Sequence, residues 1–193
     1  MSGGGDIGRA GERGPLERLL LARSVRFGEF TLASGKTSSY YIDCRLSTMS
    51  GEGMVLIGRL GVEAIRATGW APAAVGGLTM GADPVSYAIA AASFGSPPVI
   101  EAFSVRKEAK GHGTKRQIEG NFREGDPIVV IEDVITSGGS ALRAVEAVEA
   151  SGGMVLGVLA VVDREQGGRE AIEAKGHKVV ALTTSTRLGL IKA

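Results

Sequence analysis

Two adjacent carboxylates, Glu132 and Asp133, follow the apolar run 129–131 and give this sequence its strongest chemical signal. Charged groups at the end of a buried strand are unfavourable unless a ligand or partner uses them. Residues 134–140 read V-I-T-S-G-G-S, and we expect a helix to begin at Ala141. A small polar turn at a helix N-terminus presents backbone N–H groups to an anion. The acids and the turn together predict a site for a sugar and its phosphate.

The same pattern has a plainer interpretation, in which a capped helix follows a strand whose terminal acids are merely solvated. The turn is neither a GxxxxGK[ST] phosphate loop nor a GxGxxG dinucleotide loop. Carboxylates, however, accept hydrogen bonds from vicinal ribose hydroxyls and can hold hydrated Mg²⁺. The hydroxyls of Thr136, Ser137 and Ser140 are suited to phosphate. We favour the sugar-phosphate interpretation because the acids and these hydroxyls occur together.

A second group of charged residues lies in the stretch 106–120, which contains three glycines and almost no apolar residue. A polar segment of this length inside a compact domain is expected to be functional. Its cations include Arg106, Lys107, Lys110 and His112. A loop with these side chains can close over a polyanion such as pyrophosphate, neutralise charge and exclude water. The alternative is a solvated charged loop without a ligand.

Composition narrows the class of protein. The 193 residues suit one α/β domain, and 22 basic against 21 acidic residues argue against a large nucleic-acid surface. The single cysteine, Cys44, cannot form a disulfide within the chain, which fits a reducing compartment. No apolar run approaches the ~20 residues of a membrane span. We expect residues 1–14 to be a flexible arm and residues 15–193 to form one domain.

Strands and helices are expected to alternate along the chain. The predicted strands are 27–32, 40–43, 73–77, 98–105, 127–131, 154–162 and 179–182, and the predicted helices are one beginning at Pro15, then 51–68, 83–92, 141–150 and 170–174. Several strands are apolar on both faces, which is typical of a parallel sheet covered by helices on both sides. Ligands of such sheets bind beyond the carboxyl ends of the strands. Residues 27–43 are expected to form a small flap over that edge.

The run V-V-I-E-D-V-I-T-S-G-G-S at 129–140 resembles the phosphoribosyl diphosphate (PRPP) signature of type I phosphoribosyltransferases. This resemblance implies a Rossmann-like α/β fold with a central, mostly parallel sheet flanked by helices and a small flap, or hood. It also implies PRPP-binding roles for Glu132, Asp133, Val134, Ile135, Thr136, Ser137, Gly138, Gly139 and Ser140.

The stretch R-K-E-A-K-G-H-G at 106–113 is similar to the R-K-x-x-K-x-H-G lid of orotate phosphoribosyltransferases. The similarity implies that the lid cations named above contact PRPP and that Lys110 acts at the leaving group, as a general acid or a charge-stabilising contact. The segments 30–43 and 76–84 resemble the hood and the diphosphate loop of the same family. Ala33 and Gly81 stand where some members carry lysines.

Arg164, in the sequence V-V-D-R at 161–164, matches the arginine that meets the orotate carboxylate in that family. A guanidinium fork pairs well with a planar carboxylate. The alternative is a surface ion pair with the neighbouring Asp163. Thr136 is a second candidate for contact with orotate.

The resemblance implies an orotate phosphoribosyltransferase that converts orotate and PRPP to orotidine 5′-monophosphate and pyrophosphate. Asp133 would stabilise positive charge on the ribose, and Mg²⁺ would be bound mainly through PRPP and water rather than by direct protein ligands. It further implies a cytoplasmic homodimer with shared active sites and without nucleic-acid or membrane partners. One alternative is a PRPP-binding regulatory protein of the same fold, against which the intact lid argues. The other is a purine phosphoribosyltransferase, against which Arg164 and the lid argue.

Overall fold

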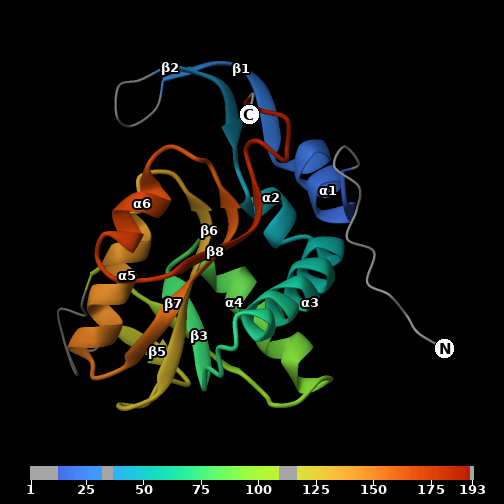
Figure 1. Cartoon of the computed structure of the whole chain (residues 1–193). Coiled ribbons are helices and arrows are strands. Elements are labelled where there is room, and N and C mark those ends of the chain that lie inside the picture. The colour runs from blue at the N-terminus through green and yellow to red at the C-terminus, as the bar shows by residue number, and fades with distance from the viewer. Residues whose placement is uncertain (1–12, 32–36, 109–116, 192–193) are drawn as a thin grey trace.

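The structure is a computed structural model that describes residues 13–31, 37–108 and 117–191 (Figure 1). Most of the expected N-terminal arm, Ala33 of the hood, and Lys110 and His112 of the lid lie outside these ranges. The elements are α1 (Pro15–Arg23), β1 (Val25–Thr31), β2 (Thr37–Ile42), α2 (Arg45–Thr48), α3 (Gly51–Ala67), β3 (Ala74–Leu78), α4 (Ala82–Phe94), β4 (Glu101–Val105), β5 (Ile118–Gly120), β6 (Pro127–Ile135), α5 (Gly139–Ala150), β7 (Met154–Asp163), α6 (Gly168–Glu173) and β8 (Val179–Thr184).

A six-stranded sheet in the order β5-β4-β3-β6-β7-β8 forms the centre of the molecule. Every neighbouring pair is parallel except β4 and β5, which are antiparallel. The prediction of a mostly parallel sheet flanked by helices is therefore confirmed. The acid pair lies near the end of β6, between β3 and β7, so the topology places it at the middle of the sheet rather than at an edge.

Alternate side chains of the central strands point to opposite faces of the sheet. Val129 and Ile131 of β6 pack on one face, with apolar residues of α1, α3 and α4. Ile128 and Val130 pack on the other, with residues of α5 and α6. All four of these side chains are fully buried. Each such burial stabilises the fold by about 1.5–3 kcal/mol, which explains why a strand apolar on both faces occupies the centre.

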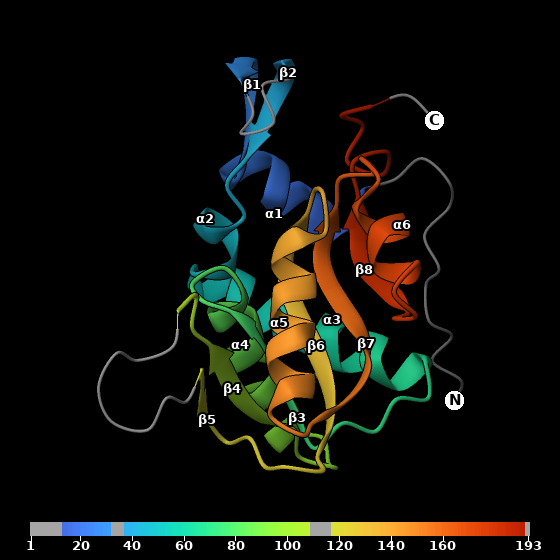
Figure 2. The same cartoon turned by 90° about the vertical axis from the view of Figure 1, so that its left-hand side faces the viewer.

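The hairpin β1–β2 forms a separate antiparallel two-stranded sheet, interrupted by a register shift between Phe27 and Phe30. Figures 1 and 2 show it projecting beyond the central sheet, at the end where β6 leads into α5. It matches the small flap expected for residues 27–43. Its second strand leads directly to the short helix α2.

Several elements differ from the prediction. The helix expected from Ala141 begins at Gly139, and α2 was not predicted. The strand expected at 98–105 begins at Glu101, after Pro97 and Pro98, which cannot donate to a ladder. The polar stretch 106–120 ends in β5, which pairs with β4 and was missed because three residues are too few to show a period. Among the described helices, none combines the length and apolar character of a membrane span.

Candidate active site

A cavity of about 400 Å³ lies at the carboxyl ends of β3, β6 and β7, beside the base of the hairpin. The predicted site residues that line it are Lys107, Glu132, Asp133, Val134, Thr136, Ser140 and Arg164. Ser137, Gly138 and Gly139 belong to the turn beside it, and Ile135 is buried in the core beneath α5 and α6. The carboxyl ends of the central strands thus bring together residues from three distant parts of the sequence.

The acid pair is held in an environment that disfavours two negative charges. Glu132 is 7% exposed, and Asp133 is partly buried beside it. Burial first, and then the hydrogen bond and the charge of Asp133, raise the pKa of Glu132 well above its usual value. Oδ1 of Asp133 accepts a hydrogen bond from the Val134 backbone N–H at 2.9 Å, which orients that carboxylate. Ligand hydroxyls or a cation would relieve the repulsion between the two groups.

The loop between β3 and α4 packs closely on the acid pair. A Cβ atom at Gly81 would lie 2.6 Å from Oδ1 of Asp133, so this position has no room for a side chain unless the carboxylate moves. Thr79 Oγ1 donates a hydrogen bond to Asp83 Oδ2 at 2.5 Å and closes the loop. In this structure, the position of Asp133 therefore leaves no space for a lysine side chain at position 81.

The turn after β6 is shaped for an anion. Gly138 has a φ of 79°, and a Cβ atom there would lie 2.7 Å from the backbone oxygen of Gly168, so only glycine fits. The helix α5 begins at the next residue, and in the described part of the chain no side chain caps its N-terminus. Its first N–H groups and the hydroxyls of Thr136 and Ser140 are therefore suited to a phosphate.

The two lid cations that the structure describes, Lys107 and Arg106, lie in different surroundings. Lys107 lines the cavity, whereas Arg106 Nε lies 3.1 Å from Oε1 of Glu119 on β5 and does not line it. Both partners of that ion pair are partly exposed, so the pair contributes little to stability. The structure thus leaves the expected contact of Arg106 with PRPP a prediction, together with those of Lys110 and His112.

The sequence left open a surface ion pair between Arg164 and Asp163, and that alternative is wrong. Asp163 is 2% exposed and accepts a hydrogen bond from Arg169 Nε at 2.8 Å. Arg164 is 5% exposed, lines the cavity and has no carboxylate partner among the described residues. A buried guanidinium that lacks a carboxylate partner is suited to bind an external anion.

No protein-family model matches this chain, but individual proteins do. Orotate phosphoribosyltransferase of Rhodopirellula baltica is 48% identical over 180 residues, covering 91% of this chain and 93% of its own length. The crystal structure of Mycobacterium tuberculosis orotate phosphoribosyltransferase in complex with Fe(III) dicitrate has a TM-score of 0.80 at 45% identity, covering 90% of this chain and 97% of that one. This chain belongs to the orotate phosphoribosyltransferase family.

A further structure of the Mycobacterium tuberculosis orotate phosphoribosyltransferase contains PRPP. It has a TM-score of 0.75 at 41% identity, and the match covers 90% of this chain and 96% of that one. The resemblance inferred from the motifs is thus confirmed across nearly the whole chain, including the fold on which the site depends.

Sequence reasoning missed two arginines that line the cavity of this orotate phosphoribosyltransferase family member, Arg45 and Arg143. Arg45 holds Asp43 through two hydrogen bonds, from Nε at 2.8 Å and from Nη2 at 3.0 Å, and the pairing lowers the pKa of Asp43. Arg143 extends from the first turns of α5 and donates a long hydrogen bond to Ser140. The only feature of the sequence that could have indicated these arginines is that each lies within three residues of a recognised motif.

Cys44 also lines the cavity wall, although packing was expected for it. The residue is 1% exposed, and burial, followed by the charges of Asp133, Asp43 and Glu132, raises the pKa of its thiol. A buried neutral thiol among acids is unreactive. Cys44 therefore belongs to the structure of the cavity rather than to its chemistry.

Proposed function

We propose that this chain transfers the 5-phosphoribosyl group of PRPP to orotate in this cavity, forming orotidine 5′-monophosphate and pyrophosphate. One observation carries the proposal: the acid pair, the N-terminus of α5 and a buried arginine meet in one cavity, and that arginine has no carboxylate partner among the described residues. These groups suit, in that order, the hydroxyls of a ribose, a phosphate and a carboxylate. PRPP offers the first two features, and orotate offers the third.

The donor binds along β6 and α5. Glu132 and Asp133 accept hydrogen bonds from the ribose hydroxyls. The residues 134–140, with the N–H groups at the start of α5, hold the 5-phosphate. Arg143, beside Ser140, adds a positive charge near the same phosphate.

The base binds at the other side of the cavity. The Arg164 fork pairs with the carboxylate of orotate through parallel hydrogen bonds, and Thr136 contacts the ring. This pairing separates orotate from purines and from uracil, which have no carboxylate. A site that leaves its arginine unpaired with the wrong base rejects that base strongly.

The reaction breaks the bond from the anomeric carbon to the diphosphate and forms a bond to a ring nitrogen of orotate. Positive charge develops on the ribose as the diphosphate leaves, and Asp133 stabilises it. Lys110 stabilises or protonates the leaving group, and Arg106, Lys107 and His112 neutralise the remaining charge. Catalysis is then mainly positional and electrostatic.

Mg²⁺ fits this cavity as a companion of PRPP. In the described ranges, no group of three or more His, Cys, Asp or Glu side chains is arranged to hold an ion. The acid pair therefore offers at most a partial ligand set, which suits an ion bound mainly to diphosphate oxygens and water. When bound, Mg²⁺ would neutralise the charge of the diphosphate. Glu132 and Asp133 would orient the ribose beside it.

A homodimer with shared active sites is part of the same proposal. The apolar residues Leu46, Met49, Met54 and Val55, from α2 to the start of α3, are between 38% and 76% exposed and follow Arg45 of the cavity wall in the chain. A second copy would cover them and bring its lid to the cavity. Mixing Lys110→Ala chains with Asp133→Asn chains should restore part of the activity. Verified mixed dimers without recovery would contradict shared sites.

A cytoplasmic location completes the proposal. The single cysteine is free and buried, which is consistent with a reducing compartment. Fractionation of cells that express the chain would test the location, with activity expected in the cytoplasmic fraction.

One assay tests the activity directly. Loss of orotate absorbance in the presence of PRPP and Mg²⁺ is expected, with no turnover of adenine, hypoxanthine or uracil in parallel reactions. Turnover of a purine but not of orotate would overturn the proposal in favour of a purine phosphoribosyltransferase. Binding of PRPP without turnover of any base would favour the regulatory protein.

A further inference from the structure

The guanidinium of Arg164 has few fixed contacts within the protein. Its backbone N–H donates to the Ile135 oxygen at 2.9 Å, which anchors the main chain at the sheet edge. Its side chain makes one long hydrogen bond, from Nη2 to Ser38 Oγ at 3.4 Å, and its buried Nε has no hydrogen-bond partner in the described residues. Hydrogen bonds alone therefore do not account for the orientation of the fork.

An aromatic ring supplies the missing constraint. The Cζ atom of Arg164 lies 4.8 Å from the ring centroid of Tyr40, which is 3% exposed. A guanidinium that stacks on a ring uses its face and keeps its N–H edges available. The contact with the ring does not itself engage the N–H donors, and apart from the long bond to Ser38 they are available to a ligand in the cavity that Arg164 lines.

Tyr40 is held at its ring hydroxyl and at its backbone. Its hydroxyl lies 3.1 Å from Ser185 Oγ, and the Ser185 N–H donates to the Asp163 oxygen at 2.9 Å, next to Arg164 in the chain. Ser38 Oγ donates to the backbone carbonyl oxygen of Tyr40 at 2.7 Å, which fixes the main chain beneath the ring, and it also accepts from Arg164. The hairpin, the end of β7 and the segment after β8 are thus joined around one guanidinium.

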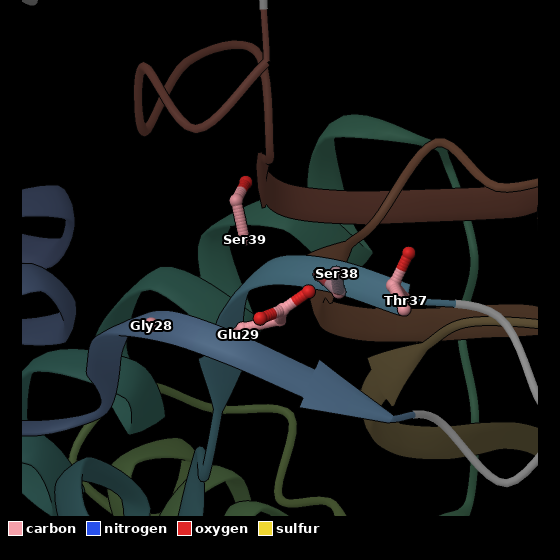
Figure 3. Close-up of a pocket in the computed structure, with 5 residues that line it drawn as sticks. All are labelled: Gly28, Glu29, Thr37, Ser38 and Ser39. Atoms are coloured by element: carbon pink, nitrogen blue, oxygen red, sulfur yellow. The ribbon is translucent and has the colours of Figure 1, made fainter.

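Ser38 has an additional place in the hairpin. It lines a separate hollow of about 490 Å³ that is formed by both strands of the hairpin (Figure 3). The described residues that line this hollow are Gly28, Glu29, Thr37, Ser38 and Ser39. Among the described residues, its lining contains none of the acid pair, the phosphate turn or Arg164, and the hydrogen bond from Arg164 to Ser38 connects it to the base side of the cavity.

We propose that Tyr40 is a positioning residue for orotate, which aims the Arg164 fork by stacking on it while Ser185 holds the tyrosine ring. The inference rests on the proposed role of Arg164 as the partner of the orotate carboxylate. It assigns Tyr40 no contact with PRPP, because the acid pair and the phosphate turn are reached from other elements. Orotate affinity should therefore depend on the ring, and PRPP affinity should not.

The test measures the KM of each substrate in Tyr40 variants. Tyr40→Leu should raise the orotate KM about tenfold and change the PRPP KM less than about twofold, because a buried cation–π contact has about this energy. Tyr40→Phe keeps the ring and should hold the orotate KM within about threefold of the original. Phe27→Leu, which removes an exposed ring of the same hairpin, is the matched control and should change neither KM.

A double variant separates positioning from packing. In an Arg164→Ala background, Tyr40→Leu should add less than about twofold to the orotate KM, since coupled residues are not additive. Additive effects, or an equal rise in the KM of PRPP, would overturn the inference. If Tyr40→Leu does not fold, Tyr40→Met carries the same expectation at similar volume.

The same series tells the two proposals apart. If Arg164→Ala leaves the orotate KM unchanged, the proposed role of Arg164 fails, and the inference fails with it. If Arg164→Ala raises the orotate KM while Tyr40→Leu and Tyr40→Met do not, the inference alone fails.

Discussion

The donor side and the base side of the cavity are assembled in different ways. On the donor side, the acid pair, the turn and the start of α5 come from nine consecutive residues, Glu132 to Ser140. On the base side, Arg164, Tyr40 and Ser185 come from three segments, and the tyrosine–serine hydrogen bond spans 145 positions. A local motif can be recognised by its letters, whereas a site built from distant segments depends on how the whole fold closes.

Because the two sides are assembled differently, we expect them to respond differently to substitutions. The donor side should fail when a single chemical group is removed, because its backbone is already set by β6 and α5. The base side should also fail when its supports are removed, because the proposed orotate contact, Arg164, is held by Tyr40 and Ser38. The predictions below test this contrast, beginning with the largest effect.

Asp133→Asn tests the donor side at its centre. The substitution keeps the side-chain shape but removes the charge that we propose stabilises the ribose, so kcat should fall by about 10²–10³-fold. Thermal unfolding should change little. Asp126→Asn, just before the opposite end of the same strand, is the matched control and should retain activity. A similar loss in both variants would mean that strand β6, rather than the acid, is responsible.

Arg169→Met tests the support of the base side. Asp163 is nearly fully buried, and removal of its partner leaves an uncompensated charge beside Arg164. Unfolding should require about 3–5 kcal/mol less free energy, measured by denaturant titration. Glu173→Gln, which removes the exposed partner of the same arginine, should cost less than about 1 kcal/mol. Equal losses would argue against the importance of the buried pair.

Arg164→Ala tests the base side at its ligand contact. Loss of a charge-assisted fork should raise the orotate KM by about 10–100-fold, with the PRPP KM nearly unchanged. Arg164→Lys keeps the charge without the fork, so its orotate KM should lie between those of the wild type and Arg164→Ala. Steady-state kinetics with each substrate varied would show this, and a parallel rise in the PRPP KM would remove the distinction between the two sides.

Gly81→Ala tests how closely the donor side is packed. The new methyl group would meet the flexible end of Asp133, so the carboxylate should move while the backbone stays in place. We expect about a tenfold loss in kcat, as for other small displacements of a catalytic group, with a nearly unchanged melting temperature. A large fall in melting temperature would show that the loop, not the carboxylate, yields.

Glu132→Gln gives the smallest expected effect and depends on pH. The pKa of Glu132 is raised in the folded protein, so the wild-type group stabilises the fold below its unfolded pKa, near 4.5, and this contribution disappears as pH rises through the folded value. The glutamine variant should therefore melt about 2–4 °C higher than wild type at neutral pH, as expected for about 1 kcal/mol. Below pH 4.5 this advantage should vanish. An advantage that is independent of pH would contradict titration of Glu132 as its cause.

Much of the architecture could be predicted because its signals are local. The apolar strands, the helix stops and the alternation of elements follow from a few neighbouring residues at a time, and they indicated a mostly parallel sheet. The short elements α2 and β5 could not be found in this way, because four and three residues show no periodicity. β5 also depends on β4 for its hydrogen bonds.

The sequence by itself determined the donor side: the acids, the glycine turn and the helix that follows occupy one continuous stretch whose geometry is set by local backbone preferences. Only the tertiary structure decided the base side. It paired Asp163 with Arg169, gave Arg164 no carboxylate partner within the described residues, and placed its guanidinium over the ring of Tyr40. It also packed Asp133 against Gly81. These contacts join residues far apart in the chain, and burial, rather than local preference, brings such residues together.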